Sequence, residues 1–112
     1  MTTITPIQLV APLALGAADA SVYSPSTNTS AQIGRAVFTN TTSSAVTITA
    51  GITAGGALGA STTMISARTL APGESYVSPE LAGAVLPANS QLHCYASAGA
   101  SVTFTASGIL IQ

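Results

Sequence analysis

The sequence predicts an all-β fold, a single small antiparallel β-sandwich or barrel of about seven or eight short strands. Three observations support this prediction. The chain has 112 residues, which is enough for one domain. Apolar and polar residues alternate with a period of two in several segments, as in strands that place one face on a core. Turn-forming residues separate these segments at intervals of about 8–12 residues. We also expect an extended N-terminal arm and one short helical turn.

Residues 1–20 are expected to form the arm, as a docking strand, and residues 21–112 the sandwich. The run from Ile4 to Ala18 is mostly apolar and ends in small residues, which resembles a secretory signal. A signal starts with positive charge, however, and Met1-Thr2-Thr3 carries none. The run is also shorter than the roughly 20 residues of a membrane-spanning helix. A docking strand is therefore favoured over a targeting segment.

Three segments show the clearest strand pattern, namely Val46–Thr53, Gln91–Ser97 and Val102–Ser107. The inward face of the first is expected to be Val46, Ile48, Ala50 and Ile52. Weaker alternation predicts two more strands, at Ile33–Thr39, whose inward face is ambiguous, and at Thr62–Leu70, where Ile65 and Ala67 lie on the face opposite to that of Arg68 and Leu70. Gly108 interrupts the last strand, which predicts a bulge or a close backbone approach there. The apolar residues Ile109–Ile111 are then expected to be buried on both sides.

Turn residues join these strands. Asn40–Ser44 and Ser97–Ala100 are each expected to close a short hairpin. Ala71–Glu74 predicts a type II turn, because Pro72 presets the first central φ and Gly73 accepts a positive φ at the second. The glycine-rich residues 54–60 are expected to form a flexible loop. Ser78-Pro79-Glu80 is a helix start with an N-cap serine, predicting a turn from Pro79 to about Val85.

The charge content excludes several classes of function. The chain has two arginines, no lysine, three acidic residues and a net charge of −1, so 4% of its residues are charged. An average soluble protein has roughly 25%. Without a basic stripe we expect no nucleic-acid partner, and no anionic membrane partner. One cysteine and one histidine make neither an internal disulfide nor a zinc site. We therefore expect no metal and no cofactor, and expect Cys94 to be a small buried apolar residue.

No motif predicts catalysis, so the chain is not expected to be an enzyme. Gly55-Gly56 with Gly59 lacks the spacing and the lysine of a phosphate-binding loop. His93 and Cys94 are adjacent on a predicted strand, so their side chains point to opposite faces. The single aspartate, Asp19, lies in the arm. Glu74 and Glu80 could approach each other, but a turn and a helix start explain them better.

A surface with so little charge is suited to permanent contact with neighbours, because few charges lose water on assembly. Arg35 and Arg68 lie within predicted strands. Each is either solvated or paired with an acid, and pairing with Glu74 or Glu80 would set the register within or between subunits. These four residues are the candidate contact sites.

Three stretches resemble small virion structural proteins of tailed bacteriophages, over roughly residues 33–112. They are Phe38–Ile48, Ile65–Tyr76 with Pro79-Glu80-Leu81, and Ala100–Ile109. Relative to that family's pattern this chain has fewer charges and a longer glycine- and alanine-rich loop at residues 54–60. The resemblance implies a virion part and assigns a chemical role to no residue.

Together these points predict a capsid decoration or cement protein that stabilises the shell through subunit contacts. Its expected partners are further copies of itself, with a trimer favoured, and other virion proteins such as the major capsid protein. Its expected location is the virion, assembled in the bacterial host cytoplasm. The alternatives are a tail, collar or fibre-associated virion protein, or a secreted adhesin or pilin-like β module. A carbohydrate-binding module is less favoured, because three tyrosines and no tryptophan offer few stacking platforms.

Overall fold

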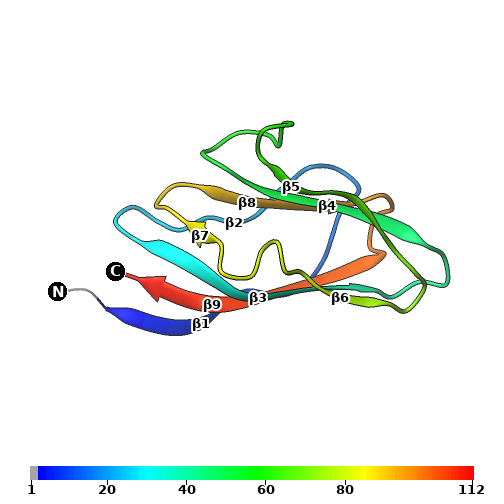
Figure 1. Ribbon diagram of the computed structural model, residues 1–112, viewed down its shortest axis with the longest axis horizontal. Coiled ribbons are helices and arrows are strands. Elements are labelled where there is room, and N and C mark those ends of the chain that lie inside the picture. The colour runs from blue at the N-terminus through cyan, green and yellow to red at the C-terminus, as the bar shows by residue number, and fades with distance from the viewer. Residues whose placement is uncertain (1–2) are drawn as a thin grey trace.

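The computed structural model describes residues 3–112, and within them the chain forms nine strands in two antiparallel sheets and no helix (Figure 1). Sheet A contains, in spatial order, β1 (Ile4–Ala14), β9 (Val102–Ile111), β3 (Ser30–Asn40) and β6 (Ser75–Val77), and β7 (Val85–Leu86) also pairs with β3. Sheet B contains, in spatial order, β2 (Ser21–Tyr23), β8 (Gln91–Ala96), β4 (Val46–Thr53) and β5 (Thr63–Leu70). The predicted all-β sandwich is confirmed.

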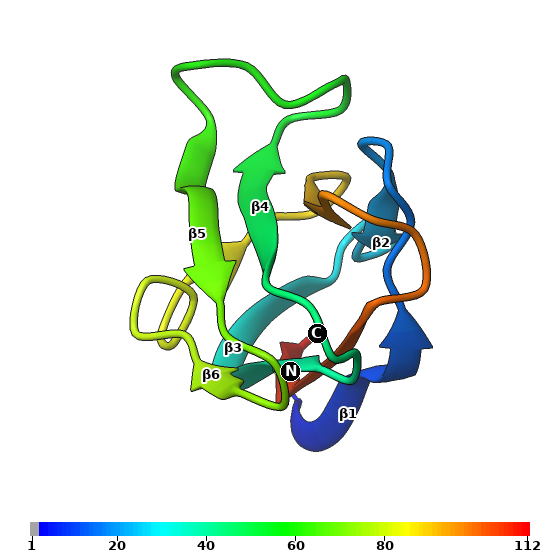
Figure 2. The ribbon, with the colours of Figure 1, turned by 90° about the vertical axis from the view of Figure 1, so that its right-hand side faces the viewer.

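The strand pairs are nested along the chain. β1 pairs with β9, β2 with β8, β3 with β6 and β7, and β4 with β5. Successive pairs alternate between sheet A and sheet B, so the chain behaves as one long hairpin rolled into two layers (Figure 2). This order of strands is that of the double-Greek-key jelly roll.

The topology corrects two hairpin predictions. Asn40–Ser44 joins β3 to β4 and Ser97–Ala100 joins β8 to β9, and in both cases the two strands belong to different sheets. Turn-forming residues mark a reversal of direction but do not determine whether the flanking strands pair. Asn40 fixes the first crossing: its buried side chain donates to the backbone oxygens of Ser44, Leu70 and Ala71 at 2.8–3.2 Å.

The predicted helical turn is also corrected. The N-cap is present, because Ser78 Oγ accepts a hydrogen bond from the Leu81 N–H at 3.2 Å. One helical bond follows, from Ala82 N–H to the Ser78 carbonyl at 3.3 Å, and the segment continues as a turn without forming a helix. Gly83 takes a φ of 83° and donates to the Ile33 carbonyl, so it ends the turn where a helix to Val85 would have continued. The type II turn at Ala71–Glu74 is as predicted, with Gly73 at a φ of 73°.

The N-terminal segment, expected as an arm, pairs with its own sheet from Ile4 to Ala14. β1 is hydrogen-bonded along β9 with two register shifts, and it contributes Leu9 and Val10 to the core. The two chain ends meet here, because Thr3 and Gln112 exchange backbone hydrogen bonds of 2.8 Å. The jelly roll thus includes β1. Within residues 3–112 the chain has no helix long and apolar enough to cross a membrane.

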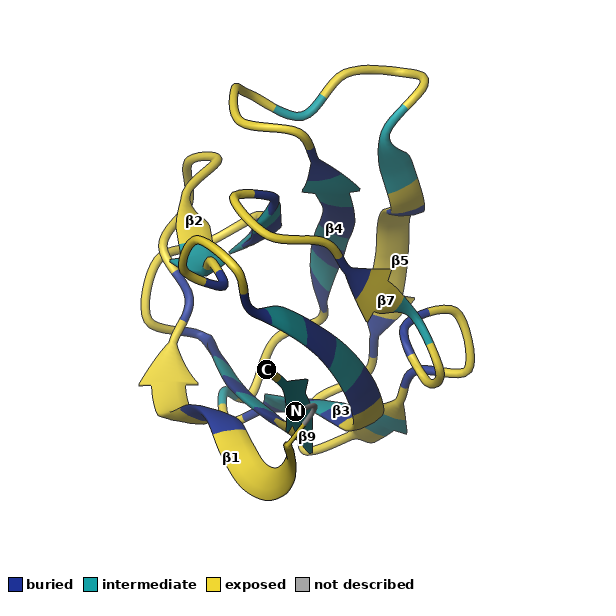
Figure 3. Ribbon diagram, turned by 90° about the vertical axis from the view of Figure 1, so that its left-hand side faces the viewer, coloured by how far each residue is buried: buried dark blue, intermediate teal, exposed yellow. Residues whose placement is uncertain are grey.

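The core between the sheets is thin and made largely of small and aliphatic side chains. Phe38 and Phe104, on neighbouring strands, are its largest fully buried side chains, and their tilted rings have centres 4.7 Å apart. Five alanines are fully buried among the strands, which lets the layers approach closely. Figure 3 shows buried and less buried residues alternating along β3 and β4, as the period of two predicts. Cys94 lies in this core, and burial raises the pKa of its thiol strongly, so it is an unreactive apolar residue.

Gly108 has the predicted close backbone approach. A Cβ at this position would overlap the carbonyl oxygen of Gln32, and β3 has a register shift between Ile33 and Arg35 beside it. The segment after it differs from the prediction. Ile109–Ile111 are half-buried rather than covered on both sides, because only the inward face of this end of β9 meets the core.

Candidate functional site

Arg68 and Glu80, two of the four candidate contact residues, lie in one cluster within the chain. Arg68 Cζ is 4.0 Å from the centre of the Tyr76 ring, a cation–π contact, and the Tyr76 hydroxyl donates a 2.5 Å hydrogen bond to Glu80 Oε1. Arg68 lies on β5 and Tyr76 on β6, which are edge strands of the two different sheets. The cluster therefore closes one side of the sandwich.

A bulge in β5 points the Arg68 side chain toward Tyr76. Two residues of β5 stand opposite Thr49 of β4, and one of them, Ala67, has a positive φ of 48°. The Ala67 N–H donates to Thr49 Oγ1 at 3.1 Å, so the bulge is held by a side chain. The extra residue places Arg68 opposite buried Ile48. This shift also corrects the predicted faces of Thr62–Leu70, because Ile65 and Leu70 are buried while Ala67 is exposed.

The protonation states of Tyr76 and Glu80 favour the hydrogen bond between them. The hydrogen bond from Tyr76 lowers the pKa of Glu80, against a smaller opposing effect of burial, and the Arg68 charge also lowers it. Burial and the Glu80 carboxylate raise the pKa of Tyr76. Around neutral pH Glu80 is thus ionised and Tyr76 protonated, the states that make the bond strongest.

Arg35 and Glu74, the other two candidates, are apart and exposed. Glu74 Oε1 accepts from the Ala71 N–H at 2.7 Å, inside its own turn. Arg35 follows the bulge in β3 and pairs in register with Ser107 on the outer face of sheet A. Within residues 3–112, no carboxylate lies within 4.0 Å of either arginine. The predicted direct Arg–Glu ion pair is therefore absent from the described part of one chain.

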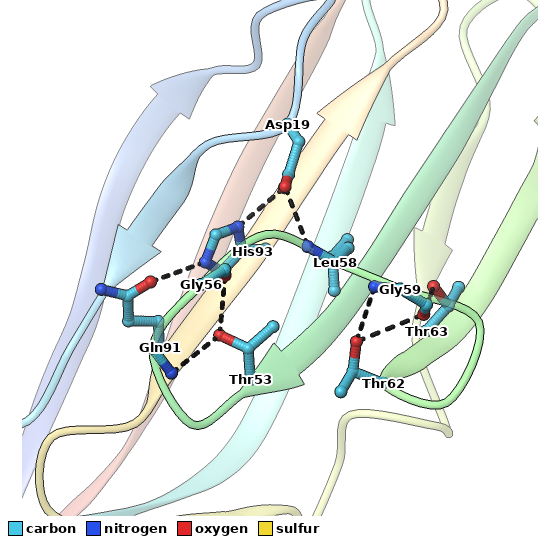
Figure 4. Close-up of polar contacts among 10 residues, drawn as sticks. Asp19, Thr53, Gly56, Leu58, Gly59, Thr62, Thr63, Gln91 and His93 are labelled. Atoms are coloured by element: carbon cyan, nitrogen blue, oxygen red, sulfur yellow. Dashed lines mark hydrogen bonds and ion pairs between the residues drawn. The ribbon is translucent and has the colours of Figure 1, made fainter.

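A polar cluster that the sequence did not predict surrounds His93 (Figure 4). His93 Nδ1 lies 2.7 Å from Asp19 Oδ1, and His93 Nε2 lies 2.8 Å from Gln91 Oε1. The other Asp19 carboxylate oxygen accepts from the Leu58 N–H at 3.0 Å. Both ring nitrogens therefore have a polar partner, so the imidazole is held on two sides. Burial raises the pKa of Asp19, but the Leu58 hydrogen bond and the bond and charge of His93 together outweigh it, and the pKa is lowered.

This cluster resembles part of a catalytic triad, but a glutamine stands where a triad has its nucleophile. A general base takes a proton from a nucleophile through the nitrogen that faces away from its aspartate. In this protein that nitrogen, His93 Nε2, faces the Gln91 amide oxygen. Cys94 points into the core on the other side of the strand. The arrangement is suited to holding segments together, because Asp19 links the β1–β2 connection to β8 and to the loop after β4.

The loop at residues 54–60 is held over the outer face of sheet B by these contacts. Gly51 is the outward-facing residue beside His93, and a Cβ there would overlap the Thr62 carbonyl oxygen and lie 2.7 Å from Leu58 Cδ2. Thr53 Oγ1 bonds the backbone of Gly55 and Gly56. The loop that was expected to be flexible is thus held by hydrogen bonds at Gly55 and Gly56 and again at Leu58. Within residues 3–112 no group of three or more His, Cys, Asp or Glu is placed to hold a metal ion.

The outer face of sheet A combines apolar side chains with serines, threonines and a glutamine. Cross-strand neighbours on this face include Pro6, Ile109, Gln32 and Val85 in one row, and Ile4 with Ile111 in the next. Ile4 is 61% and Val85 54% exposed. A pocket of about 320 Å³ lies beside Arg35, lined by Gln32, Ile33, Gly34, Gly83, Gly108 and Ile109. Arg35 is the charged residue of this face.

Comparison with known proteins identifies the fold only. No protein-family model and no curated protein matches the chain. Among solved structures, a chain in the structure of infectious bursal disease virus, Gx strain, aligns with a TM-score of 0.55 at 17% sequence identity. The alignment covers 99% of this chain and 32% of that one, so this chain spans about a third of the viral chain. At this identity the likeness is one of fold, and it extends over the whole jelly roll.

Proposed function

We propose that this protein is a non-enzymatic structural subunit of a virus particle, and that it acts as a capsid decoration or cement protein. The observation that carries the proposal is the complete jelly roll with a nearly uncharged outer face on sheet A. Jelly rolls occur in viral capsids, and also in lectins and cupins. Because a fold alone does not determine function, the surface has to distinguish among these.

The surface favours assembly over catalysis or sugar binding. In the histidine–aspartate pair, the second nitrogen of His93 is occupied by Gln91. The cation–π cluster joins the edge strands of the two sheets. A cupin-type metal site has at least three converging metal-ligating side chains. Within residues 3–112 no such group is present. Three of the exposed large apolar side chains, Ile4, Val77 and Val85, lie instead on the outer face of sheet A, where contact with a neighbour removes apolar surface from water and desolvates few charges.

The likeness in fold to a chain of infectious bursal disease virus and the resemblance to phage virion proteins both support a virion location. The expected partners are further copies of the chain, as a trimer, and the major capsid protein. Assembly in the cytoplasm of a bacterial host follows from the phage resemblance and is part of the proposal.

The test is quantitative mass spectrometry of virus particles purified by density gradient from cells that produce this chain. A decoration protein is expected in a fixed ratio to the major capsid protein, with a copy number of the same order. A far smaller copy number would indicate the alternative of a tail, collar or fibre-associated protein. Absence from particles, with recovery from the cell surface or medium cleaved near Ala20, would overturn the proposal and favour the adhesin.

A second experiment tests the cement role directly. Recombinant protein is added to particles that lack it, and the temperature at which the particles release their genome is measured. Binding with a rise in that temperature is expected. Binding without a rise would remove the cement function but leave a virion location.

A further inference from the structure

We propose that the outer face of sheet A binds a second copy of this chain, and that the Ala71–Glu74 turn of that copy docks beside Arg35. The inference deepens the proposed function and rests on the self-association that it includes. Three observations carry it: the pairing of the charges, the composition of the face, and the pocket next to Arg35.

The first observation is that three of the five charges are already engaged within the chain. Asp19 pairs with His93, and Arg68 and Glu80 meet at Tyr76. Arg35 and Glu74 remain, and both are exposed. They cannot reach each other in one copy. The Glu74 carbonyl accepts a hydrogen bond from the Asn40 N–H, which places Glu74 beside the end of β3. Arg35 lies five residues before Asn40 on this strand, about 17 Å away at about 3.4 Å per residue.

The second observation is that Arg35 stands in a surface of apolar and uncharged polar side chains. The apolar residues on its face include Ile4, Pro6, Val37, Val85, Ile109 and Ile111. Covering this surface with a neighbour would leave the guanidinium desolvated unless the neighbour brings a carboxylate. In a second copy, Glu74 is the acid whose carboxylate bonds to no side chain within residues 3–112, and only one of its carboxylate oxygens is hydrogen-bonded there. The charges of two copies are therefore complementary.

The third observation is the pocket of about 320 Å³ whose wall includes Gly34, the residue before Arg35. Three of its six lining residues are glycines, so much of its wall is backbone. The Ala71–Glu74 turn is small and exposed, and it presents Pro72 two residues before Glu74. A proline ring seated in this pocket would bring the Glu74 carboxylate of the second copy to the guanidinium of Arg35.

The contact joins different surfaces of the two copies, so it is heterologous. Such contacts close into rings when the rotation allows it. Each subunit has one Arg35 face and one Glu74 turn. In a closed ring every Arg35 face binds the Glu74 turn of a neighbour, so no copy of either surface is left unoccupied. This agrees with the trimer expected for the proposed function.

The test is a charge exchange in the full chain, with self-association measured by sedimentation velocity and light scattering. Arg35→Glu and Glu74→Arg are each expected to raise the dissociation constant at least about tenfold. The double variant restores the pair in reversed order and is expected to return within about threefold of the wild type. Its net charge equals that of the wild type, so the rescue is independent of overall charge. Ala98→Glu, at an exposed loop residue, is the control for added negative charge and should change nothing.

Three outcomes would overturn the inference: a wild-type chain that stays monomeric at high concentration, single variants that associate normally, or a double variant that is not rescued. Circular dichroism establishes that each variant is folded. Arg35→Gln and Glu74→Gln, which keep side-chain length, replace any reversal that does not fold, and must each weaken association. If the chain is present in particles yet these variants behave as wild type, the inference fails while the proposed function stands. If the chain is absent from particles, the proposed function fails whatever the variants do.

Discussion

Gly108→Ala is expected to destabilise the protein strongly, because β9 passes too close to β3 for a side chain at this position. A Cβ would overlap the Gln32 carbonyl oxygen and lie 3.0 Å from both the Gln32 carbonyl carbon and the Gly34 nitrogen. These are backbone atoms of the neighbouring strand, so relief requires the two strands to separate by roughly 1 Å, which weakens the ladder hydrogen bonds beside the bulge. Losing about two of them at about 1.5 kcal/mol each lowers the free energy of unfolding by about 3 kcal/mol.

The assay is urea unfolding followed by circular dichroism at one low protein concentration, since self-association adds to apparent stability. The corresponding fall in melting temperature is about 12 °C for a domain of this size. Gly99→Ala is the matched control, because nothing lies within 4 Å of a Cβ at residue 99, and it should change stability by less than about 0.5 kcal/mol. A loss below about 1 kcal/mol in Gly108→Ala would refute the close-approach reasoning.

Four further predictions concern single side chains. Asn40→Ala should lower the free energy of unfolding by about 3 kcal/mol, because it leaves buried carbonyls without donors, and a urea midpoint like that of the wild type would contradict this. Asp19→Asn should be less stable than the wild type above pH 4. Since the folded-state pKa of Asp19 is lowered, that advantage is lost as the pH falls through the folded-state value, and urea titrations at several pH values measure it. Ala67→Gly should raise stability by about 0.5 kcal/mol by relieving the positive φ, whereas Ala67→Val should lower it. Cys94 should react with a thiol reagent only after denaturation, and rapid reaction in the native protein would argue against its burial.

Local features of the fold could be predicted from the sequence, since they depend on neighbouring residues. The period of two located the long strands, Pro72-Gly73 identified its turn type, and Ser78 identified its cap. The assignment of strands to sheets could not be predicted, because Asn40–Ser44 has the same composition whether it closes a hairpin or crosses the core.

The charged clusters depend on tertiary structure and were predicted only in part. Arg68 and Glu80 were expected to be contact residues, but the tyrosine that joins them was not identified. Asp19 and His93 are 74 residues apart, and no local pattern connects them. One signal was present: in a chain with so few charges, its single aspartate and its single histidine each need a partner.

The nested strand order has a consequence for how this chain is made. β9 lies between β1 and β3 in sheet A, yet it is the last of these nine strands along the chain. Sheet A therefore stays split in two until β9 has left the ribosome, and β1 waits for a partner about a hundred positions away along the chain. Folding should be slow, with the apolar residues of β1 exposed until β9 is available. A chain shortened before Val102 would lose a central strand, so we expect such a truncated product to aggregate or be degraded.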